Sequence, residues 1–288
     1  MSSPAVSVLM TCYNRQKFIE EAISSVLDSD FPDFELIISD DGSTDESLAI
    51  AGRYAETDKR VIVSRNSQNL GDYPNRNKAA SIARGEFIMF CDSDDKFFPS
   101  TISYCVEAMR RFPQAGIGMY YAGKDRGDKP VIVKSVDACR QHFFEAPFLT
   151  IGPGGTILRK TFFDSIHGYP VKYGPANDMY FNLKAASQSD ILLLPWLFLF
   201  YRIHDSQEQN NLDSYKVNNF RYLRDAIKEL NLPLNPEETK YVTNKNRRRF
   251  ISNFLRTIFF QRRPAKAFEI LRKSGFQMRD LFYGIFHT

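Results

Sequence analysis

The chain has 288 residues, of which 43% are hydrophobic, so it has enough apolar material for one large domain with a substantial core. The formal net charge is only +4, and it is uneven, because Lys and Arg outnumber Asp and Glu by about five to one from Lys245 onward. The longest apolar run, Ile191–Tyr201, is shorter than the roughly 20 residues of a membrane-spanning helix and contains Pro195, which argues against a transmembrane segment.

The cysteines and the N-terminal residues indicate in which cellular compartment the protein works. Cys12, Cys91, Cys105 and Cys139 form no C-x-x-C pair and lie in or near apolar runs, as reduced buried thiols do, so we expect no disulfide framework. The first apolar run, Val6–Met10, is short and has no basic leader, so we expect no signal peptide. These patterns predict a cytoplasmic protein.

The first 110 residues alternate between two hydrophobic patterns. Four short runs that are apolar throughout predict buried strands: VSVLM (6–10), FELIIS (34–39), VIVS (61–64) and FIMF (87–90). Between them, residues 17–27 have the apolar spacing of a helix, and Pro99 suits the first turn of another, whose core-facing residues would be Ile102, Cys105, Val106 and Met109. Strands alternating with helices predict a doubly wound, mostly parallel α/β sheet.

Beyond Arg110 the pattern is less regular. Residues 151–160 suggest a Gly-rich turn into a strand, residues 174–187 a loop entering a helix, and residues 197–209 a strand running into a polar loop. From Asn218 onward the sequence predicts helices.

Three acids directly follow the predicted strand at 87–90. Asp92, Asp94 and Asp95 lie where open α/β sheets bind ligands, beyond the carboxyl ends of the strands. Capping the helix after Pro99 would need only one of them, and like charges so close repel. A divalent cation is the more economical partner, since Mg²⁺ is commonly held by one or two carboxylates plus substrate phosphates. The segment therefore predicts a metal–phosphate site.

Two more acids, Asp40 and Asp41, end the second predicted strand. Gly42 suits a turn there, and Ser43 or Thr44 suits the cap of the next helix. A turn does not require paired acids. A carboxylate at this edge can hydrogen-bond a nucleobase or ribose, as acids do in other open α/β folds.

The ordered motifs resemble the family 2 glycosyltransferases of the GT-A fold. The segments VSVLMTCYNRQKFIEEAISSVLDSDFPDFELIISDDGSTDES and NLGDYPNRNKAASIARGEFIMFCDSDD carry the resemblance, which is close over about 110 residues and looser to about Gln209. It implies a GT-A catalytic domain over 1–210, with a nucleotide-binding half (1–110) and an acceptor-binding half (111–210). A basic, amphipathic helical region (211–288) would follow.

The resemblance also implies roles in donor binding. Thr11 and Tyr13 would line the nucleotide pocket, Asp41 would read the uracil of a UDP-sugar, and Arg76 would help to close the base site.

The acidic motif takes its roles from the same resemblance. Asp92 is the first acid of D-x-D, and Asp94 and Asp95 would lie at the ribose and at the metal-bound diphosphate. The metal, Mn²⁺ or Mg²⁺, would arrive with the donor.

The resemblance places a general base at the start of a helix in the second half. Asp178 occupies that place, where Asn177 departs from the frequent Glu-Asp pair of the family; capping of the helix is the alternative role for Asp178.

The segment FYRIH resembles the Tyr-Arg-x-His segment of the family. Arg202 or His204 would contact the diphosphate or the metal there, although a single His is often structural.

The C-terminal residues mix Arg and Lys with Phe, Ile and Leu at helical spacing. An apolar face would contain Phe250, Ile251, Phe254, Leu255 and Ile258. Such helices either pack on the catalytic domain or form a peripheral membrane surface, since basic amphipathic helices attract anionic lipid. Nucleic acid is a poorer partner, because no binding motif accompanies the charge.

The sequence thus predicts a metal-dependent inverting glycosyltransferase that moves one sugar from a nucleotide donor, expected to be UDP-linked, to a hydroxyl acceptor. The acceptor would be a glycan or a lipid-linked glycan of surface polysaccharide or lipopolysaccharide assembly, at the inner face of the membrane. Two alternatives remain open. One is a nucleotidyltransferase, although TCYNRQKF (11–18) has no glycine for a phosphate loop; the other is a non-catalytic nucleotide-sugar-binding module.

Overall fold

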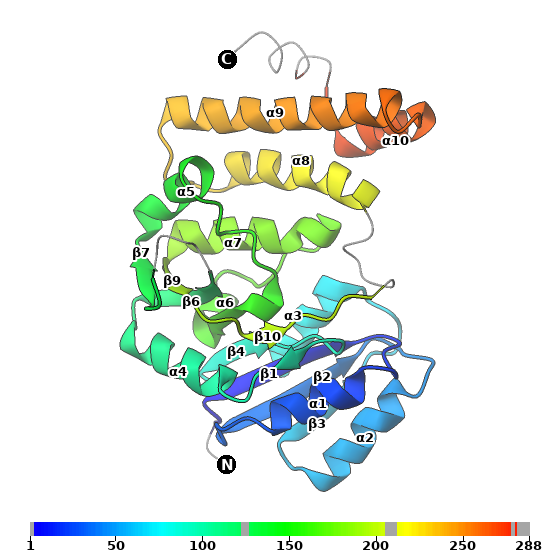
Figure 1. The fold of residues 1–288 in the computed structure, drawn as a ribbon, viewed down its shortest axis with the longest axis vertical. Helices are drawn as coiled ribbons and strands as arrows, with labels where there is room; N and C mark the ends of the chain where they lie inside the picture. The colour runs from blue at the N-terminus through cyan, green and yellow to red at the C-terminus, as the bar shows by residue number, and fades with distance from the viewer. Residues whose placement is uncertain (1–2, 122–126, 205–211, 278–279, 281–288) are drawn as a thin grey trace.

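The computed structural model describes residues 3–121, 127–204, 212–277 and 280, and shows one large sheet covered by helices (Figure 1). Its strands are ordered β3-β2-β1-β4-β8-β6-β9-β7. They are β1 (Val6–Cys12), β2 (Phe34–Asp40), β3 (Val61–Arg65), β4 (Phe87–Phe90), β6 (Ala115–Tyr120), β7 (Val131–Val133), β8 (Thr156–Arg159) and β9 (Asp190–Leu194).

The first half of the sheet is parallel, as the apolar runs predict. β1 pairs with β2 and β4, and β2 pairs with β3, all in parallel. Cys12 lies opposite Asp40 in this register, so the ends of β1 and β2 meet at one edge of the sheet. The residues that follow β1, β2 and β4 are therefore neighbours in space.

The second half of the sheet is mixed. β8 follows the Gly-rich turn η1 (Pro153–Gly155) and is antiparallel to β4 and β6, whereas β9 is parallel to β6. Two short strands form a separate antiparallel pair, β5 (Lys96–Phe97) and β10 (Leu199–Phe200). This pair holds the segment after β10 beside the acidic motif.

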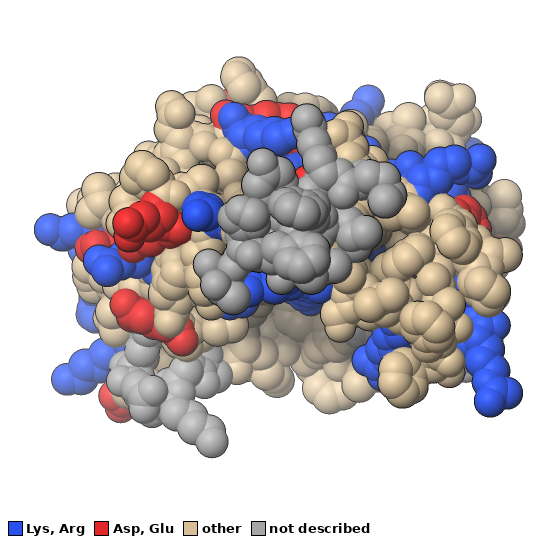
Figure 2. Space-filling view, turned by 90° about the horizontal axis from the view of Figure 1, so that it is seen from above, with Lys and Arg blue, Asp and Glu red and all other residues tan. Residues whose placement is uncertain are grey.

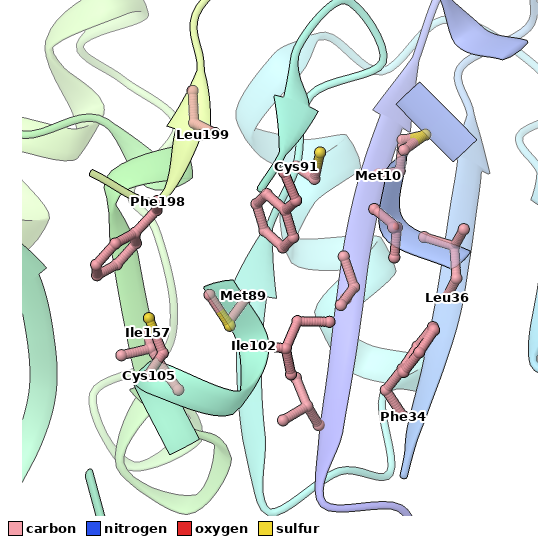
Figure 3. Packing of buried hydrophobic residues seen from close by; sticks show 14 of the residues in the cluster. Met10, Phe34, Leu36, Met89, Cys91, Ile102, Cys105, Ile157, Phe198 and Leu199 are labelled. Carbon is pink, nitrogen blue, oxygen red and sulfur yellow. The ribbon is translucent and has the colours of Figure 1, made fainter. Parts of the chain in front are cut away.

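Helices cover both faces of the sheet. One face packs on α1 (Ile19–Leu27), α2 (Ser47–Thr57) and α4 (Thr101–Arg111), and Figure 3 shows part of this core. The other face packs on α3 (Asp72–Ile82), α5 (Ser135–Phe144), α6 (Lys160–Ser165) and α7 (Asn177–Gln188). Val8 and Leu9 of β1 belong to opposite cores, which confirms that this strand is buried on both sides.

Three C-terminal helices extend the second layer. α8 (Leu212–Glu229) packs on α7 and on the short helix η2 (Gly174–Ala176), and α9 (Pro236–Phe259) and α10 (Pro264–Ser274) pack on α8 (Figure 1). Of the predicted apolar face, Phe250 and Ile251 are buried, whereas Leu255 is exposed. Among the described residues, no helix combines the length and the apolarity needed to cross a bilayer.

Two predictions from the sequence concern residues that the structure does not describe. The predicted polar loop continues to Gln209, and its residues 205–209 lie outside the described residues, as does the predicted domain boundary between 210 and 211. The division into two halves and a C-terminal region stays a prediction.

Two predicted helix starts are wrong. α4 begins at Thr101 rather than at Pro99, because the Pro99 carbonyl accepts hydrogen bonds from the Asp30 N–H and the Ser29 hydroxyl instead of serving the helix. α2 begins at Ser47, so neither Ser43 nor Thr44 caps it.

The segment before α2 has other hydrogen-bond partners. The Ser43 N–H donates to the Asp40 carboxylate, and the Ser43 hydroxyl accepts from the Asn14 N–H. The Asn14 side chain accepts from the Thr44 N–H. Gly42 has a φ of +81°, which confirms the turn.

Two glycines provide a matched test of the packing. A Cβ atom on Gly85 would lie 2.5 Å from the backbone nitrogen of Ser7 in β1, whereas one on Gly52, inside α2, would meet nothing within 4 Å. We predict that Gly85→Ala lowers the free energy of unfolding by about 3 kcal/mol through overpacking, and that Gly52→Ala raises it by about 0.5–1 kcal/mol. Urea unfolding of both variants checks this, and an unchanged midpoint for Gly85→Ala would contradict the tight contact between β1 and the start of β4.

Candidate active site

A cavity of about 1020 Å³ opens beyond the carboxyl ends of β1, β2 and β4. Its wall also includes the turn η1, the start of α7 and the segment around β10. The following predicted site residues line it: Thr11, Tyr13, Asp41, Arg76, Asp92, Asp94, Asp95 and Asp178. The structure thus gathers these residues, which are far apart in sequence, around one space.

Asp92 is held by a buried arginine from α3. Arg76 Nη1 and Nη2 lie 2.7 and 3.0 Å from the two carboxylate oxygens of Asp92, a bidentate pair. Arg76 Nε lies 2.8 Å from Asp72 Oδ1 at the start of the same helix. The Arg76 guanidinium therefore faces two carboxylates, and its predicted role at the nucleobase stays a prediction.

Asp94 contacts two cationic or titratable side chains from other segments. Its Oδ2 accepts a hydrogen bond of 3.0 Å from Arg15 Nε and lies 2.9 Å from His204 Nε2. The His204 ring stacks on Phe18, with 4.8 Å between the ring centroids. Asp94 and His204, both predicted at the metal, are thus in direct contact.

Asp95 is buried and is joined to the segment after β10. Its Oδ1 accepts from the Arg202 backbone N–H at 3.0 Å. The Arg202 guanidinium donates to the Asp94 carbonyl at 3.0 Å and to Glu21 at 2.9 Å. Burial raises the pKa of Asp95 to about 7, so an additional positive charge nearby would favour its ionised form.

Protein cations therefore already compensate part of the acidic motif. The sequence predicts a divalent cation as the partner of the three acids, but Arg76 already pairs with Asp92 and Arg15 with Asp94. These arginines lie 16 and 79 residues away from their partners, so a local reading of the motif does not find them.

Asp41 lines the cavity after β2 and holds the loop that follows β3. One of its oxygens accepts from the Asn66 side chain and the Leu70 N–H, and the other accepts from the Gly71 N–H. Gly71 has a φ of +90°, which allows the chain to turn into α3. Asp41 thus fixes the 66–71 loop at the cavity, where its predicted contact with uracil stays a prediction.

Asp178 lies in the first turn of α7, on the cavity wall. Its Oδ1 accepts from the Met179 N–H at 2.7 Å. Burial raises the pKa of Asp178 to about 7, although the helix N–H groups and Arg76 lower it. Asn177 is buried, and its side chain accepts from the Tyr173 N–H, so it ties the preceding turn to the helix.

Three residues that contact or line the site are not among those predicted from the sequence. Arg15 follows β1 at the ligand edge, which is a signal that could have identified it. Ser214 and Tyr215 line the cavity from α8, in a region where the sequence shows only helical spacing. No local pattern points to those two residues.

A comparison with protein families matches residues 7–163, more than half of the chain, to "Glycosyl transferase family 2". Among curated relatives, the Bacillus subtilis protein TuaG, named as a glycosyltransferase of teichuronic acid biosynthesis, is 40% identical over 106 residues, 37% of this chain and 42% of TuaG. The Campylobacter jejuni GalNAc(5)-diNAcBac-PP-undecaprenol beta-1,3-glucosyltransferase is 37% identical over 102 residues, 35% of this chain and 33% of that enzyme. The match thus spans less than half the length of these relatives.

Solved structures share the fold. The S. aureus TarS 1-349 structure in complex with UDP-GlcNAc has a TM-score of 0.72 at 22% identity, covering 93% of this chain and 81% of that one. The mannosyltransferase PcManGT from Pyrobaculum calidifontis, in complex with GDP-Man and Mn²⁺, has a TM-score of 0.66 at 15% identity, covering 96% of this chain and 88% of that one. The predicted GT-A fold is confirmed.

The raised pKa of Asp178 makes a prediction about stability. The folded state holds the proton up to about pH 7, whereas the ordinary value is 3.8, so ionised Asp178 opposes folding. Native stability relative to Asp178→Asn should therefore fall as the pH rises from about 4 to 7 and then level off. We expect Asp178→Asn to be more stable by up to about 4 kcal/mol above that range and equal to native at its acidic end.

Thermal melting across this pH range checks the prediction. The exposed Asp33→Asn is the matched control and should melt with the native protein throughout. A difference between Asp178→Asn and native that does not change with pH would contradict the assigned pKa.

Proposed function

This chain belongs to glycosyl transferase family 2, and on that premise we propose that it transfers one sugar from a UDP-linked donor to a hydroxyl acceptor with inversion. The acceptor is a glycan or lipid-linked glycan of surface polysaccharide assembly. The observation that carries the proposal is the single cavity that brings Asp178 and the D-x-D acids together. Four free, buried cysteines suit a reducing compartment and support a cytoplasmic site of action.

The donor would occupy the part of the cavity next to β1, β2 and β4. Asp41 and the loop that it fixes would hold the nucleobase, with Thr11 and Tyr13 beside it. TarS, which shares the fold, binds UDP-GlcNAc, and this supports a uridine nucleotide here.

The acceptor would enter from the side of Asp178. An ionised Asp178 takes the proton of the acceptor hydroxyl, whose oxygen then bonds to the anomeric carbon. The bond from that carbon to the diphosphate oxygen breaks, and attack from the opposite face inverts the configuration. A pKa of about 7 suits a base at neutral pH, because the group is both partly ionised and a good proton acceptor.

The residues present fit a divalent cation that comes with the donor. The Asp94 carboxylate and His204 Nε2 lie side by side, with Asp95 adjacent, and oxygen and imidazole ligands suit Mn²⁺. Within the described ranges, no set of three His, Cys, Asp or Glu side chains forms a metal site by itself, so diphosphate oxygens would complete the shell. The cation, when bound, stabilises the charge on the departing diphosphate. PcManGT, which shares the fold, was solved with Mn²⁺.

Two arginines would also serve the leaving group. Arg15 and Arg202 now contact Asp94 and its carbonyl, and both stand next to the predicted diphosphate position. If Asp94 turns to the cation, the Arg15 guanidinium becomes available to phosphate oxygens, which bind arginine well.

Two other functions are a nucleotidyltransferase and a non-catalytic nucleotide-sugar-binding module. Family membership argues against a nucleotidyltransferase. A non-catalytic module would keep donor binding but would show no turnover, so the experiments below separate it from an enzyme.

The first experiment measures donor binding across a panel of nucleotide sugars, with Mn²⁺, with Mg²⁺ and with EDTA. We predict that one UDP-sugar binds with metal and not with EDTA, and that Asp94→Asn loses this dependence. Asp178→Asn should bind the donor as native does but transfer sugar about 10²–10⁴-fold more slowly. If no nucleotide sugar binds under any condition, the proposed function is wrong, and native binding without any transfer or hydrolysis would favour the module.

The second experiment is a pH profile. We predict that kcat/KM falls about tenfold per pH unit below about pH 7, because the base must be ionised. Donor affinity, measured separately over the same range, distinguishes Asp178 from Asp95, whose pKa is also raised to about 7. An acidic limb that appears in donor affinity alone would assign the titration to the donor site rather than to Asp178.

A further inference from the structure

The turn between α9 and α10 exposes an unusual group of apolar side chains. Leu255, Phe259, Phe260 and Phe268 are 44, 69, 85 and 59% exposed. Leu255 and Phe259 are four residues apart, so they share one face of α9. Exposing three phenylalanines to water is unfavourable, since burying such a side chain is worth about 1.5–3 kcal/mol.

The same part of the chain is strongly basic. Residues 239–275 contain eleven Lys and Arg residues and one acid, Glu269. Arg256, Arg262 and Arg272 are exposed beside the aromatic side chains. Figure 2 looks onto this end of the molecule, where blue atoms border a broad uncharged area on the right and red atoms gather mainly on the left. We call these seven residues the α9–α10 patch: Leu255, Arg256, Phe259, Phe260, Arg262, Phe268 and Arg272.

The patch is held in a fixed position. Phe254 of α9 packs edge to face on Phe268 of α10, with 5.7 Å between the ring centroids. Gln261 in the turn accepts from Lys216 of α8 at 3.1 Å, and Arg263 pairs with Asp213 of α8 at 3.1 Å. These contacts fasten the turn to the first turn of α8.

That first turn of α8 also borders the candidate active site. Ser214 and Tyr215 line the cavity, while their neighbours Asp213 and Lys216 hold the α9–α10 turn. The start of α8 therefore connects the cavity to the turn that carries the patch. In Figure 1 the beginning of α8 and the end of α9 lie on the same side of the molecule as residues 201–204, which follow β10.

We propose that the α9–α10 patch docks on an anionic lipid bilayer and so presents the cavity to a lipid-linked acceptor. Aromatic and leucine side chains insert at the boundary between headgroups and acyl chains, and arginines bind the lipid phosphates. A second copy of this chain is the poorer occupant, since a symmetric contact would set the arginines of one copy against those of the other. The acceptor class rests on the proposed function, whereas bilayer binding does not.

Vesicle co-sedimentation tests the proposal on the full chain. The native protein should bind vesicles of phosphatidylcholine that contain about a third phosphatidylglycerol. Its affinity for vesicles of phosphatidylcholine alone should be lower by a factor of at least about ten. Added salt should weaken the binding, because it screens the charges.

Two variants separate the contribution of the aromatic rings to vesicle binding from that of the arginines. Phe259→Ser with Phe260→Ser removes the inserting rings, and Arg256→Glu with Arg262→Glu and Arg272→Glu reverses the charge. Each should reduce binding about tenfold or more. The matched controls are Val136→Ser, which is 64% exposed on α5, and Arg110→Glu with Arg111→Glu on α4; both should bind as native does.

Donor binding and the oligomeric state are measured on the same proteins. Patch variants that lose vesicle binding but match the native protein in donor binding support the proposal. If the native protein binds no donor, an unchanged melting temperature shows instead that the variants are folded, and their loss of vesicle binding still supports the proposal. If native protein ignores anionic vesicles, or if the control variants lose as much binding as the patch variants, the proposal is overturned. A native dimer that becomes monomeric in the Phe259→Ser Phe260→Ser variant, without vesicle binding, would assign the patch to a second copy instead.

Discussion

Six carboxylates surround one cavity, and their mutual repulsion is the constraint on which the rest of the structure depends. Asp41, Asp72, Asp92, Asp94, Asp95 and Asp178 all line this space. Arg76 is the principal compensation, because it is buried and faces both Asp72 and Asp92. Asp92 is partly buried, so loss of this arginine would leave its carboxylate poorly compensated, whereas the more exposed Asp72 would be compensated by water.

The fold supplies these cations from segments that are far apart in sequence. Arg15 follows β1, Arg76 lies in α3, and Arg202 follows β10. The parallel register of β1 with β2 and β4 brings the ends of those strands together, and the β5–β10 pair brings Arg202 to the same edge. The sheet topology is thus also the means by which the charges of the site are balanced.

This distribution explains how much the sequence could predict. Runs such as FIMF are apolar throughout and fix the buried parallel strands locally, and the acidic residues after them mark the ligand edge. The partners of the acids could not be predicted, since a pair such as Arg15 and Asp94 depends on tertiary packing across 79 residues. The start of α4 was misplaced for the same reason, because a contact of Pro99 with Asp30 overrides a good local signal.

The sequence predicts the C-terminal helices as a region apart from the catalytic domain, but in the structure they pack against it. Helical spacing alone suggests an independent appendage, because it reports which face of a helix is apolar but not what that face meets. In the structure α8 packs on α7, whose first turn carries Asp178, and α8 itself adds Ser214 and Tyr215 to the cavity. A change in how α8 sits on α7 would therefore alter the space in front of Asp178, so the C-terminal helices form part of the wall that an acceptor would meet.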